Sequence, residues 1–195
     1  MIKGCIQKMK LILASGSPRR RELLKMTGLK FDVVTSDADE SIPDNTTPGI
    51  AALILSERKA LAVANLEDCK GSVVIGADTI VSLDGKKFGK PKDEDDAFRM
   101  LSELSDRTHT VYTGVSIVNS DLTVNKFVEA TEVHFYPLSE KQIRDYIATG
   151  EYQDKAGGYA IQGGGAVFIS GIIGDYYNVM GLPIGRLMQE MSKIH

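Results

Sequence analysis

The hydrophobic and polar positions along the chain predict strands that alternate with helices. Apolar runs of strand composition are each followed by turn residues or by a stretch of helical periodicity. The predicted strands are residues 11–14, 31–35, 72–76 with an extended continuation at 79–83, 111–119, 127–135 and 166–170. The predicted helices are residues 19–27, 48–65, 93–104, 139–149 and 184–194. Asp84-Gly85 predicts a hairpin turn, and residues 120–125 predict a longer hairpin.

This alternation predicts one α/β domain rather than several. The sequence has no repeat, no low-complexity tract and no Pro- or Ser-rich linker. Its 195 residues suffice to bury a core without a disulfide or a metal staple. Met9-Lys10 resembles a second start of the chain, so we expect residues 1–8 to form a poorly ordered extension and residues 9–195 to form the domain.

Composition excludes several classes of protein. The 23 Lys and Arg residues oppose 26 Asp and Glu residues, and the net charge of −3 argues against a generally basic nucleic-acid coat. No apolar run approaches the roughly 18 residues of a membrane span, so we expect no membrane segment. Cys5 and Cys69 match neither a disulfide framework nor a Cys-x-x-Cys motif, which favours the reduced cytoplasm.

A basic turn lies between the first predicted strand and the first predicted helix. Ser15-Gly16-Ser17 exposes backbone N–H groups, and three arginines follow at positions 19–21. Because the helix dipole disfavours cations at a helix N-terminus, an anionic ligand such as phosphate explains these guanidinium groups better. A solvated basic turn is the alternative. The segment matches neither a P-loop nor a Rossmann fingerprint.

Two acidic residues come after predicted strands. Asp78 follows the apolar run 72–76, and we expect it at the carboxyl end of that strand, where α/β proteins bind ligands. A carboxylate buried there must be paired or metal-bound, and a turn Asp that caps local N–H groups is the alternative. Glu40 lies in an acidic loop, where a solvated charge is the simpler interpretation.

Four further residues are candidates of weaker signal. Lys59 is expected in mid-helix, and Lys90 precedes a proline that keeps it extended and able to reach across a cleft, although each alone reads as a surface charge. Gln162 lies in a glycine-rich segment and offers a donor and an acceptor suited to a nucleobase edge; a glycine-rich turn is the alternative. His109 is expected to be a hydrogen-bonded structural histidine at a junction between a loop and a strand; a catalytic base is the alternative. In combination, the candidates indicate a phosphorylated, base-bearing ligand held with a divalent metal.

An ordered set of motifs resembles the Maf family of nucleoside triphosphate pyrophosphatases. The resemblance runs from about Met9 to the C-terminus. Its motifs are Ser15-Gly-Ser-Pro-Arg-Arg, Gly76-Ala-Asp-Thr-Ile-Val, Lys90-Pro, Thr108-His-Thr-Val-Tyr-Thr-Gly, Asp154-Lys-Ala-Gly-Gly-Tyr-Ala-Ile-Gln-Gly and Gly181-Leu-Pro. As a set they are highly specific. Asp106 departs from the pattern, because the family usually has glycine there.

The resemblance implies a fold and a reaction. The fold is an elongated mixed-sheet α/β structure like that of inosine triphosphate pyrophosphatases, with two lobes around a central cleft. The reaction is hydrolysis of the α–β phosphoanhydride with a divalent cation, Mg²⁺ or Mn²⁺, giving a nucleoside monophosphate and pyrophosphate. Tyr-Ala-Ile-Gln-Gly looks like the branch that acts on dTTP and UTP, and modified pyrimidine nucleotides would suit the same chemistry. The resemblance also favours a homodimer.

It also implies roles for individual residues. Asp78 would accept a proton and lie near the metal, with Glu40 helping to position metal or water. Substrate specificity would rest on Arg19, Thr79 and Gln162, since the branch that prefers 7-methyl-GTP typically carries Glu at the position of Gln162. The phosphates would be held by Ser15, Arg19, Arg20, Lys59 and Lys90.

Two other functions compete with the pyrophosphatase hypothesis. One is a regulatory nucleotide- or nucleic-acid-binding protein linked to cell division, which the basic residues 19–21 allow although the net charge disfavours broad nucleic-acid affinity. The other is phosphoryl or nucleotidyl transfer, which requires an acceptor substrate. Release of pyrophosphate in water alone distinguishes the hydrolase from both.

Overall fold

A mixed sheet of seven strands forms the centre of the protein. The computed structural model describes residues 10–35 and 37–194, so the predicted extension, residues 1–8, lies outside the described residues. The strand order is β2-β1-β3-β5-β6-β7, with β4 paired to β3; β1 pairs in parallel with β2 and β3, and all other pairs are antiparallel. The strands are β1 (Leu11–Ala14), β2 (Asp32–Val33), β3 (Val73–Leu83), β4 (Lys86–Phe88), β5 (Thr108–Val118), β6 (Val124–Phe135) and β7 (Ile169–Ile173).

Helices cover the sheet, and their ends carry the expected sequence signals. Pro18 opens the first helix, Asp93 caps another through the N–H of Asp96, and Ser139 forms a capping box with Gln142. The α-helices are α2 (Pro18–Met26), α3 (Pro48–Ala64), α4 (Glu94–Leu104), α5 (Glu140–Ile147), α6 (Tyr176–Met180) and α7 (Ile184–Met191). The 3₁₀ turns are η1 (Glu67–Cys69), η2 (Ala156–Gly158) and η3 (Gly164–Phe168).

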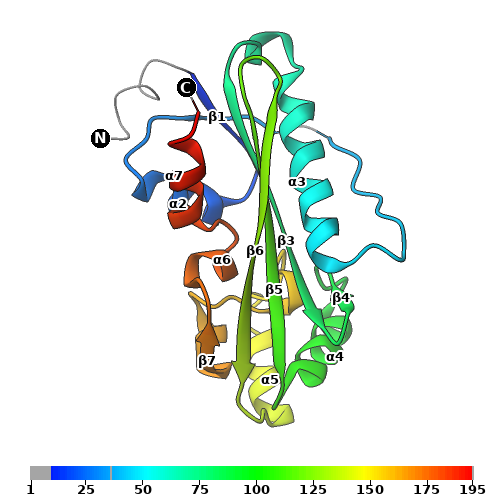
Figure 1. Cartoon of the computed structure of the whole chain (residues 1–195). Coiled ribbons are helices and arrows are strands. Elements are labelled where there is room, and N and C mark those ends of the chain that lie inside the picture. The colour runs from blue at the N-terminus through cyan, green and yellow to red at the C-terminus, as the bar shows by residue number, and fades with distance from the viewer. Residues whose placement is uncertain (1–9, 36, 195) are drawn as a thin grey trace.

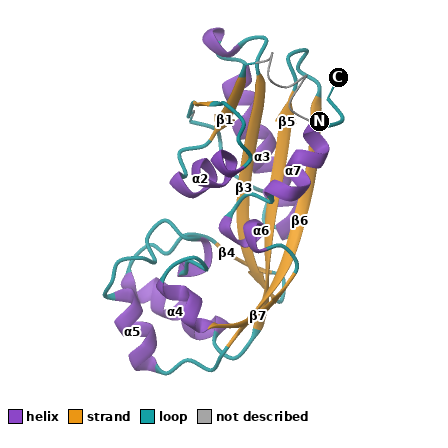
Figure 2. Ribbon diagram, turned by 90° about the vertical axis from the view of Figure 1, so that its left-hand side faces the viewer, coloured by secondary structure: helices purple, strands orange, loops and turns teal. Residues whose placement is uncertain are grey.

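The molecule is elongated and has two lobes that share the long strands (Figures 1 and 2). The upper lobe holds β1, β2, α2 and α7, whose apolar side chains, Leu13, Leu24 and Leu187 among them, form one core. The lower lobe holds α4, α5 and β7, whose core includes Leu101 and Phe168. Strands β3, β5 and β6 run through both lobes, so the mixed α/β architecture expected from the sequence is confirmed.

Strand β3 contributes buried residues to both cores, and the residues between those two buried stretches are less buried. Its first five residues and its last three are buried, whereas Asp78, Thr79 and Ile80 are only half-buried. The expectation that Asp78 lies at the carboxyl end of a strand is therefore wrong. Antiparallel pairing with β5, from Val74 opposite Val118 to Ser82 opposite Thr110, carries the strand straight past Asp78.

Helix α3 packs unusually close to the sheet because two glycines face it. A Cβ added to Gly76 would lie 2.3 Å from the carbonyl oxygen of Ser56, and one added to Gly114 would lie 2.4 Å from that of Ala52. Any side chain at either position would push the helix away. The close contact brings Lys59, one turn after Ser56, onto the half-buried part of β3.

Several element boundaries differ from those predicted. The strand predicted at 166–170 is instead the 3₁₀ turn η3 followed by β7, because Gly164 and Gly165 favour a tight turn. β2 keeps only two of the five residues predicted as strand at 31–35, since it pairs with β1 at two positions alone. The five-residue helix α6, with Asp175 as its cap, was not predicted.

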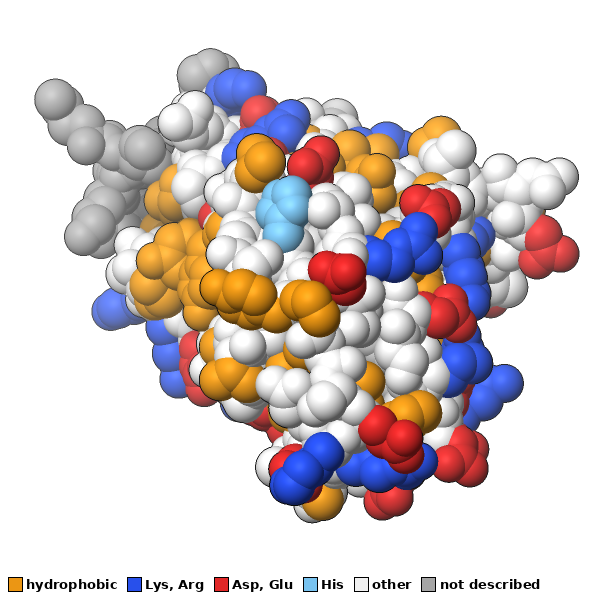
Figure 3. All heavy atoms as spheres, turned by 90° about the horizontal axis from the view of Figure 1, so that it is seen from below, with side chains coloured by type: hydrophobic (Ala, Val, Ile, Leu, Met, Phe, Trp, Pro, Cys, Tyr) orange, Lys and Arg blue, Asp and Glu red, His pale blue; other side chains and the backbone are white. Residues whose placement is uncertain are grey.

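Strand β7 forms one edge of the sheet at the lower end of the molecule. Seen from below, hydrophobic side chains gather in a band across this end (Figure 3). Tyr136, Val167 and Ile173, which lie on or beside β6 and β7, are all more than half exposed. Within residues 10–35 and 37–194, no helix combines the length and the apolar character needed to cross a bilayer.

Candidate active site

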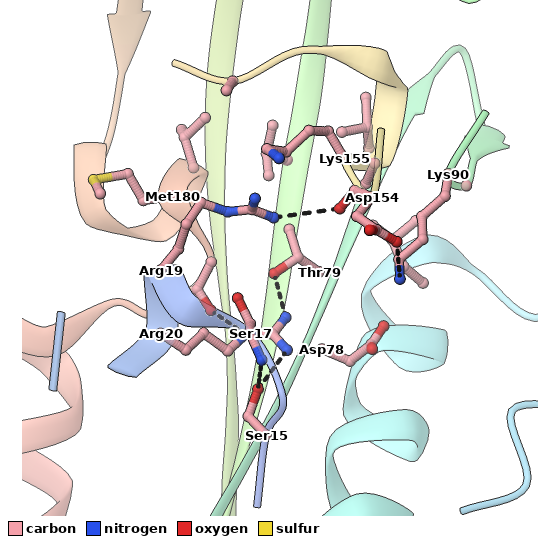
Figure 4. A pocket seen from close by; sticks show the side chains of 18 of the residues that line it. Ser15, Ser17, Arg19, Arg20, Asp78, Thr79, Lys90, Asp154, Lys155 and Met180 are labelled. Atoms are coloured by element: carbon pink, nitrogen blue, oxygen red, sulfur yellow. Dashed lines mark hydrogen bonds and ion pairs between the residues drawn. The ribbon is translucent and has the colours of Figure 1, made fainter. Parts of the chain in front are cut away.

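One cavity of about 860 Å³ lies between the lobes and gathers the predicted catalytic, specificity and phosphate-binding residues, whereas Arg21 of the basic turn lies outside it. Figure 4 shows it from close by, with side chains converging from β1 and α2 on one side and from the lower lobe on the other. The predicted residues that line it are Ser15, Arg19, Arg20, Glu40, Lys59, Asp78, Thr79, Lys90 and Gln162.

The cavity is basic although the chain as a whole is acidic. Six basic and three acidic side chains line it, against a net charge of −3 for the chain. The basic ones are Arg19, Arg20, Lys59, Lys87, Lys90 and Lys155, and the acidic ones are Glu40, Asp78 and Asp154. Low-dielectric walls that carry one sign of charge concentrate ligands of the opposite sign. The cavity therefore suits a polyanion.

Lys59 joins the two carboxylates expected to do the chemistry. Its Nζ lies 2.5 Å from Oδ1 of Asp78 and 2.8 Å from Oε1 of Glu40. The hydrogen bond from Lys59 lowers the pKa of the Glu40 carboxyl below its usual value. The other oxygen of Asp78, Oδ2, has no hydrogen-bond partner among the described residues, and it is free to accept a proton from a ligand or a water.

Arg20 is held by the protein rather than left free in the cavity. Its Nε donates to the carbonyl oxygen of Gly181 at 2.8 Å, its Nη2 donates to Oγ1 of Thr79 at 3.0 Å, and its Nη1 reaches Oγ of Ser15 at 3.5 Å. Two of these bonds, to Thr79 and Ser15, are visible in Figure 4. Burial lowers the pKa of the guanidinium, which nevertheless stays cationic at neutral pH. Arg20 is thus a fixed positive charge.

A second basic group lies across the cavity around Asp154. Nζ of Lys90 lies 3.2 Å from its carboxylate, and Nη2 of Arg19 donates to its carbonyl oxygen at 3.4 Å (Figure 4). The contact of Arg19 bridges the two lobes. Lys155 is next in the chain, and burial, followed by the charge of Arg19, lowers the pKa of its ammonium. Asp154 thus brings Arg19, Lys90 and Lys155 together on this side of the cavity.

The segment that carries Gln162 is fastened at three points. The Tyr159 hydroxyl lies 2.7 Å from Nε2 of His109, the Ala160 N–H donates to the Tyr146 hydroxyl at 3.2 Å, and the Gly164 N–H donates to Glu151 at 2.7 Å. The Gln162 side chain itself is exposed to the cavity and has no hydrogen-bond partner among the described residues. A free amide on a fixed backbone is suited to recognising a ligand.

His109 is the structural histidine that the sequence predicted. It is 1% exposed, contacts Phe135 and Tyr159 edge-on, and bonds the Tyr159 hydroxyl. Burial lowers its pKa to about 4, so the imidazole is neutral at neutral pH. Its Nε2 faces the hydroxyl of Tyr159, a side chain that is only 5% exposed, which fits a structural role.

The two carboxylates fit a divalent cation only in company with a ligand. No group of three or more His, Cys, Asp or Glu side chains within the described ranges could hold a metal on its own. Mg²⁺ characteristically takes one or two carboxylates and completes its shell with phosphate oxygens and waters. Asp78 and Glu40, held beside each other by Lys59, match that donor set.

Three charged residues of the cavity were not predicted as site residues. Lys155 and Asp154 belong to a recognised motif, and Lys87 lies on β4, but none of them has a spacing that marks it as a ligand. Lys87 also ties down the loop before α3, donating to the carbonyl oxygens of Asp44 and Thr46. The one signal available from sequence was charge, since Lys155 follows Asp154 in a segment otherwise rich in glycine.

The α/β fold encloses a basic cavity in which a lysine lies between two carboxylates and a free glutamine amide is exposed. Such a cavity is the site of an enzyme that acts on a phosphorylated ligand. The chain belongs to the Maf family, because the family model described as Maf-like protein matches residues 10–194.

Relatives that carry a functional name are similar over nearly the whole length. A protein of Bacillus cytotoxicus named dTTP/UTP pyrophosphatase is 50% identical over 184 residues, which cover 94% of this chain and 95% of that protein. A protein of the same name from Bacillus cereus (strain B4264) is 48% identical over the same shares. Among solved structures, a HAM1 protein from Coxiella burnetii matches with a TM-score of 0.47 and 14% identity, over 95% of this chain and 98% of that one.

Proposed function

We propose that this protein hydrolyses the α–β phosphoanhydride of dTTP and UTP, giving the nucleoside monophosphate and pyrophosphate. One observation carries the reaction: Asp78, with a free carboxylate oxygen, faces a cavity lined by six cations. The choice of substrate is supported by the relatives, which are named dTTP/UTP pyrophosphatases at 47–50% identity. Modified pyrimidine nucleotides fall within the same proposal.

The cations would bind the triphosphate from two sides. Arg20, fixed by Thr79 and Gly181, presents a guanidinium fork from the upper lobe, together with the Ser15 hydroxyl and the N–H groups at the start of α2. Lys90 and Lys155 approach from across the cavity, and Arg19, also on α2, extends toward them and contacts Asp154. Charge neutralisation is the largest task in cleaving a polyphosphate, because the substrate repels any attacking oxygen. Positions fixed before binding make that neutralisation effective.

Asp78 would act as the proton acceptor. Lys59 occupies its Oδ1, which leaves Oδ2 to take a proton from a water that attacks the α-phosphorus in line with the leaving pyrophosphate. The hydrogen bond from Lys59 fixes the orientation of the carboxylate. Glu40, on the other side of Lys59, would orient the same water or hold a metal.

A divalent cation, Mg²⁺ or Mn²⁺, would be held by Asp78 and Glu40 together with phosphate oxygens. When bound, it supplies positive charge that polarises the phosphoryl group and neutralises the leaving pyrophosphate. Because Lys59 already contacts one oxygen of each carboxylate, the protein offers the metal few direct ligands. This arrangement agrees with the way Mg²⁺ binds in nucleotide enzymes, where substrate provides much of the shell.

Recognition of the base would rest on Gln162, with Arg19 and Thr79 contributing to specificity. The Gln162 amide can pair with the donor and acceptor edge that thymine and uracil share. Arg19 lines the cavity beside the same loop, and its pKa is lowered by burial. Thr79 acts through Arg20, because the Thr79 hydroxyl accepts a hydrogen bond from the Arg20 guanidinium.

The regulatory alternative finds less support. Two of the three basic residues that suggested nucleic acid, Arg19 and Arg20, line the cavity instead of spreading over an outer surface. A cytoplasmic location suits the proposed substrates and the buried free thiol of Cys69. The homodimer expected from the family resemblance stays a prediction.

A panel of triphosphates tests the proposal. Pyrophosphate release is measured from dTTP, UTP, CTP, GTP and 7-methyl-GTP, each with and without Mg²⁺ or Mn²⁺. We expect metal-dependent release that is fastest with dTTP and UTP. Fastest release from 7-methyl-GTP would keep the reaction and overturn the substrate assignment. Folded protein that binds dTTP without releasing pyrophosphate under any condition would overturn the reaction.

A further inference from the structure

The guanidinium of Arg20 closes a ring of hydrogen bonds that runs through the sheet. Its Nη2 donates to Oγ1 of Thr79 at 3.0 Å, and that oxygen lies 3.0 Å from Oγ1 of Thr113. Oγ1 of Thr113 donates to the carbonyl oxygen of Asn178 at 2.9 Å. The N–H of Gly181 donates to the same carbonyl oxygen at 2.9 Å, and the carbonyl of Gly181 accepts Nε of Arg20 at 2.8 Å.

The direction of every bond in this ring is fixed by chemistry. The carbonyl oxygen of Asn178 can only accept, so the single hydroxyl proton of Thr113 is committed to it. Thr113 must then accept from Thr79, whose proton points into the sheet. The lone pairs of Thr79 are thereby turned toward Arg20, which can only donate. Each hydroxyl donates once and accepts once, an arrangement in which the bonds strengthen one another.

Thr113 lies outside the cavity, yet its hydroxyl is hydrogen-bonded to Thr79, one of the two residues that hold Arg20 in the cavity. It is fully buried, it is not among the residues that line the cavity, and it is the direct partner of Thr79 across β3 and β5. The two acceptors that hold Arg20, Thr79 Oγ1 and the carbonyl oxygen of Gly181, are themselves held by the ring. Thr79 is bonded to the Thr113 hydroxyl, and the Gly181 N–H is bonded to the carbonyl oxygen of Asn178 at the end of α6. Gly181 has φ +114°, a conformation that side chains rarely adopt, and a Cβ there would lie 3.3 Å from the Thr79 oxygen and crowd it.

We propose that Thr113 is a positioning residue for the reaction: its hydroxyl orients Thr79, which orients Arg20 toward the phosphates. The expected kinetic effect rests on the proposed function, whereas the ring of hydrogen bonds is independent of it. A loosened Arg20 can still meet the phosphates of bound substrate, where Arg19, Lys90 and Lys155 also contribute binding. It would no longer be preorganised for the charge that develops in the transition state. Loss of the Thr113 hydroxyl therefore affects turnover more than binding.

The test replaces Thr113 by valine, which keeps the shape and the β-branch and removes the hydroxyl. We expect kcat for dTTP to fall about tenfold or more while KM changes less than about threefold. Thr113→Ser, which restores the donor, should recover most of that loss. Nitrogen-15 NMR supplies a readout without substrate: the Nε–H signal of Arg20, identified by its absence in Arg20→Lys, should exchange with solvent faster in Thr113→Val than in the unaltered protein.

Thr131→Val is the matched control. Thr131 is 1% exposed on the neighbouring strand β6, and its hydroxyl contacts the Asp175 backbone and the side chain of Asn178, but not the Asn178 carbonyl oxygen through which the ring runs. We expect it to lower stability without changing kcat or the Arg20 signal. Equal loss of kcat in both variants, or an unchanged kcat in Thr113→Val, would overturn the inference. If the unaltered protein releases no pyrophosphate, the proposed function fails, and the NMR comparison still decides the role of Thr113.

Discussion

Lys59 and Asp78 form the closest charged pair at the centre of the cavity, with Nζ and Oδ1 2.5 Å apart. Both side chains are mostly buried, 22% and 13% exposed respectively. They come from α3 and β3, which approach so closely because Gly76 lacks a side chain under Ser56. The pair orients the carboxylate that we propose as the proton acceptor, and it places Glu40 beside it.

Lys59→Met should lower kcat/KM for dTTP roughly 100-fold, because the buried Asp78 loses the cation that orients it. Methionine keeps the apolar stem of the lysine. Carbon-13 NMR titration should also show the pKa of Glu40 rising toward its ordinary value, since the hydrogen bond from Lys59 is the largest cause of its depression. The control is Glu57→Gln, two residues away, whose carboxylate pairs with Lys126 on another face of the helix. Similar kinetics in both variants would contradict the role of Lys59.

The pH dependence of stability should contain a contribution from His109. Its folded pKa of about 4 lies below the ordinary value of 6.5, so the unfolded chain binds the proton more readily. The stability gained from a neutral ring is therefore present above pH 6.5 and is lost as the pH falls toward 4. By linkage, the loss between pH 7 and pH 4 amounts to about 3 kcal/mol.

Urea unfolding of the unaltered protein and of His109→Gln, at both pH values, measures this contribution. Glutamine can still bond the Tyr159 hydroxyl but does not titrate. We expect the variant to be less stable at pH 7 and the difference in unfolding free energy to shrink by about 3 kcal/mol at pH 4. A difference that is the same at both pH values would show that His109 is not buried as a neutral ring.

Gly163→Ala should weaken substrate binding by displacing the fastened loop. A Cβ at this position would lie 1.6 Å from Oε1 of Glu151, so the carboxylate must move and release the N–H of Gly164. We expect KM for dTTP to rise about tenfold with a smaller change in kcat, since Gln162 is next in the chain. Gly171→Ala is the control, because a Cβ there meets nothing within 4 Å. Equal KM values in the two variants would refute a fixed base-reading loop.

Gln162→Glu should change the preference for the base. The carboxylate loses the amide donor and presents only acceptors, so kcat/KM for dTTP should fall at least about tenfold relative to that for 7-methyl-GTP. Gln189→Glu on the exposed side of α7 introduces the same charge away from the cavity and should leave the ratio unchanged. An unchanged ratio in Gln162→Glu would remove Gln162 from the specificity assignment.

Most residues that line the candidate site could be proposed from the sequence because local motifs carry them, whereas Glu40 and Lys59 lie outside those motifs and the geometry of the cavity could not be predicted. Ser15 and Arg20 lie in one turn, and the sequence identifies them together. The position of Asp78 in mid-strand depends on β5, whose residues 110–118 pair with β3 and whose Gly114, distant in sequence, lies opposite Asp78. Such pairing leaves no mark in the local alternation of apolar and polar residues.

The same limit explains the residues that were missed. Asp154 reaches Arg19 only because the lower lobe packs against the shared strands, and its own neighbours in sequence give no sign of it. Thr113 is an ordinary strand residue until its register with Thr79 is known. Helix α6 has five residues, too few for a periodic pattern, although its cap Asp175 and its final Gly181 are recognisable afterwards.

The products of dTTP hydrolysis test the central claim most directly. Phosphorus-31 NMR of a complete reaction with Mg²⁺ should show dTMP and pyrophosphate in equal amounts, with neither dTDP nor orthophosphate. Asp78→Asn, folded by circular dichroism and thermal unfolding, should form these products at least about 1,000-fold more slowly. Formation of dTDP and orthophosphate, or undiminished pyrophosphate release by Asp78→Asn, would contradict the account.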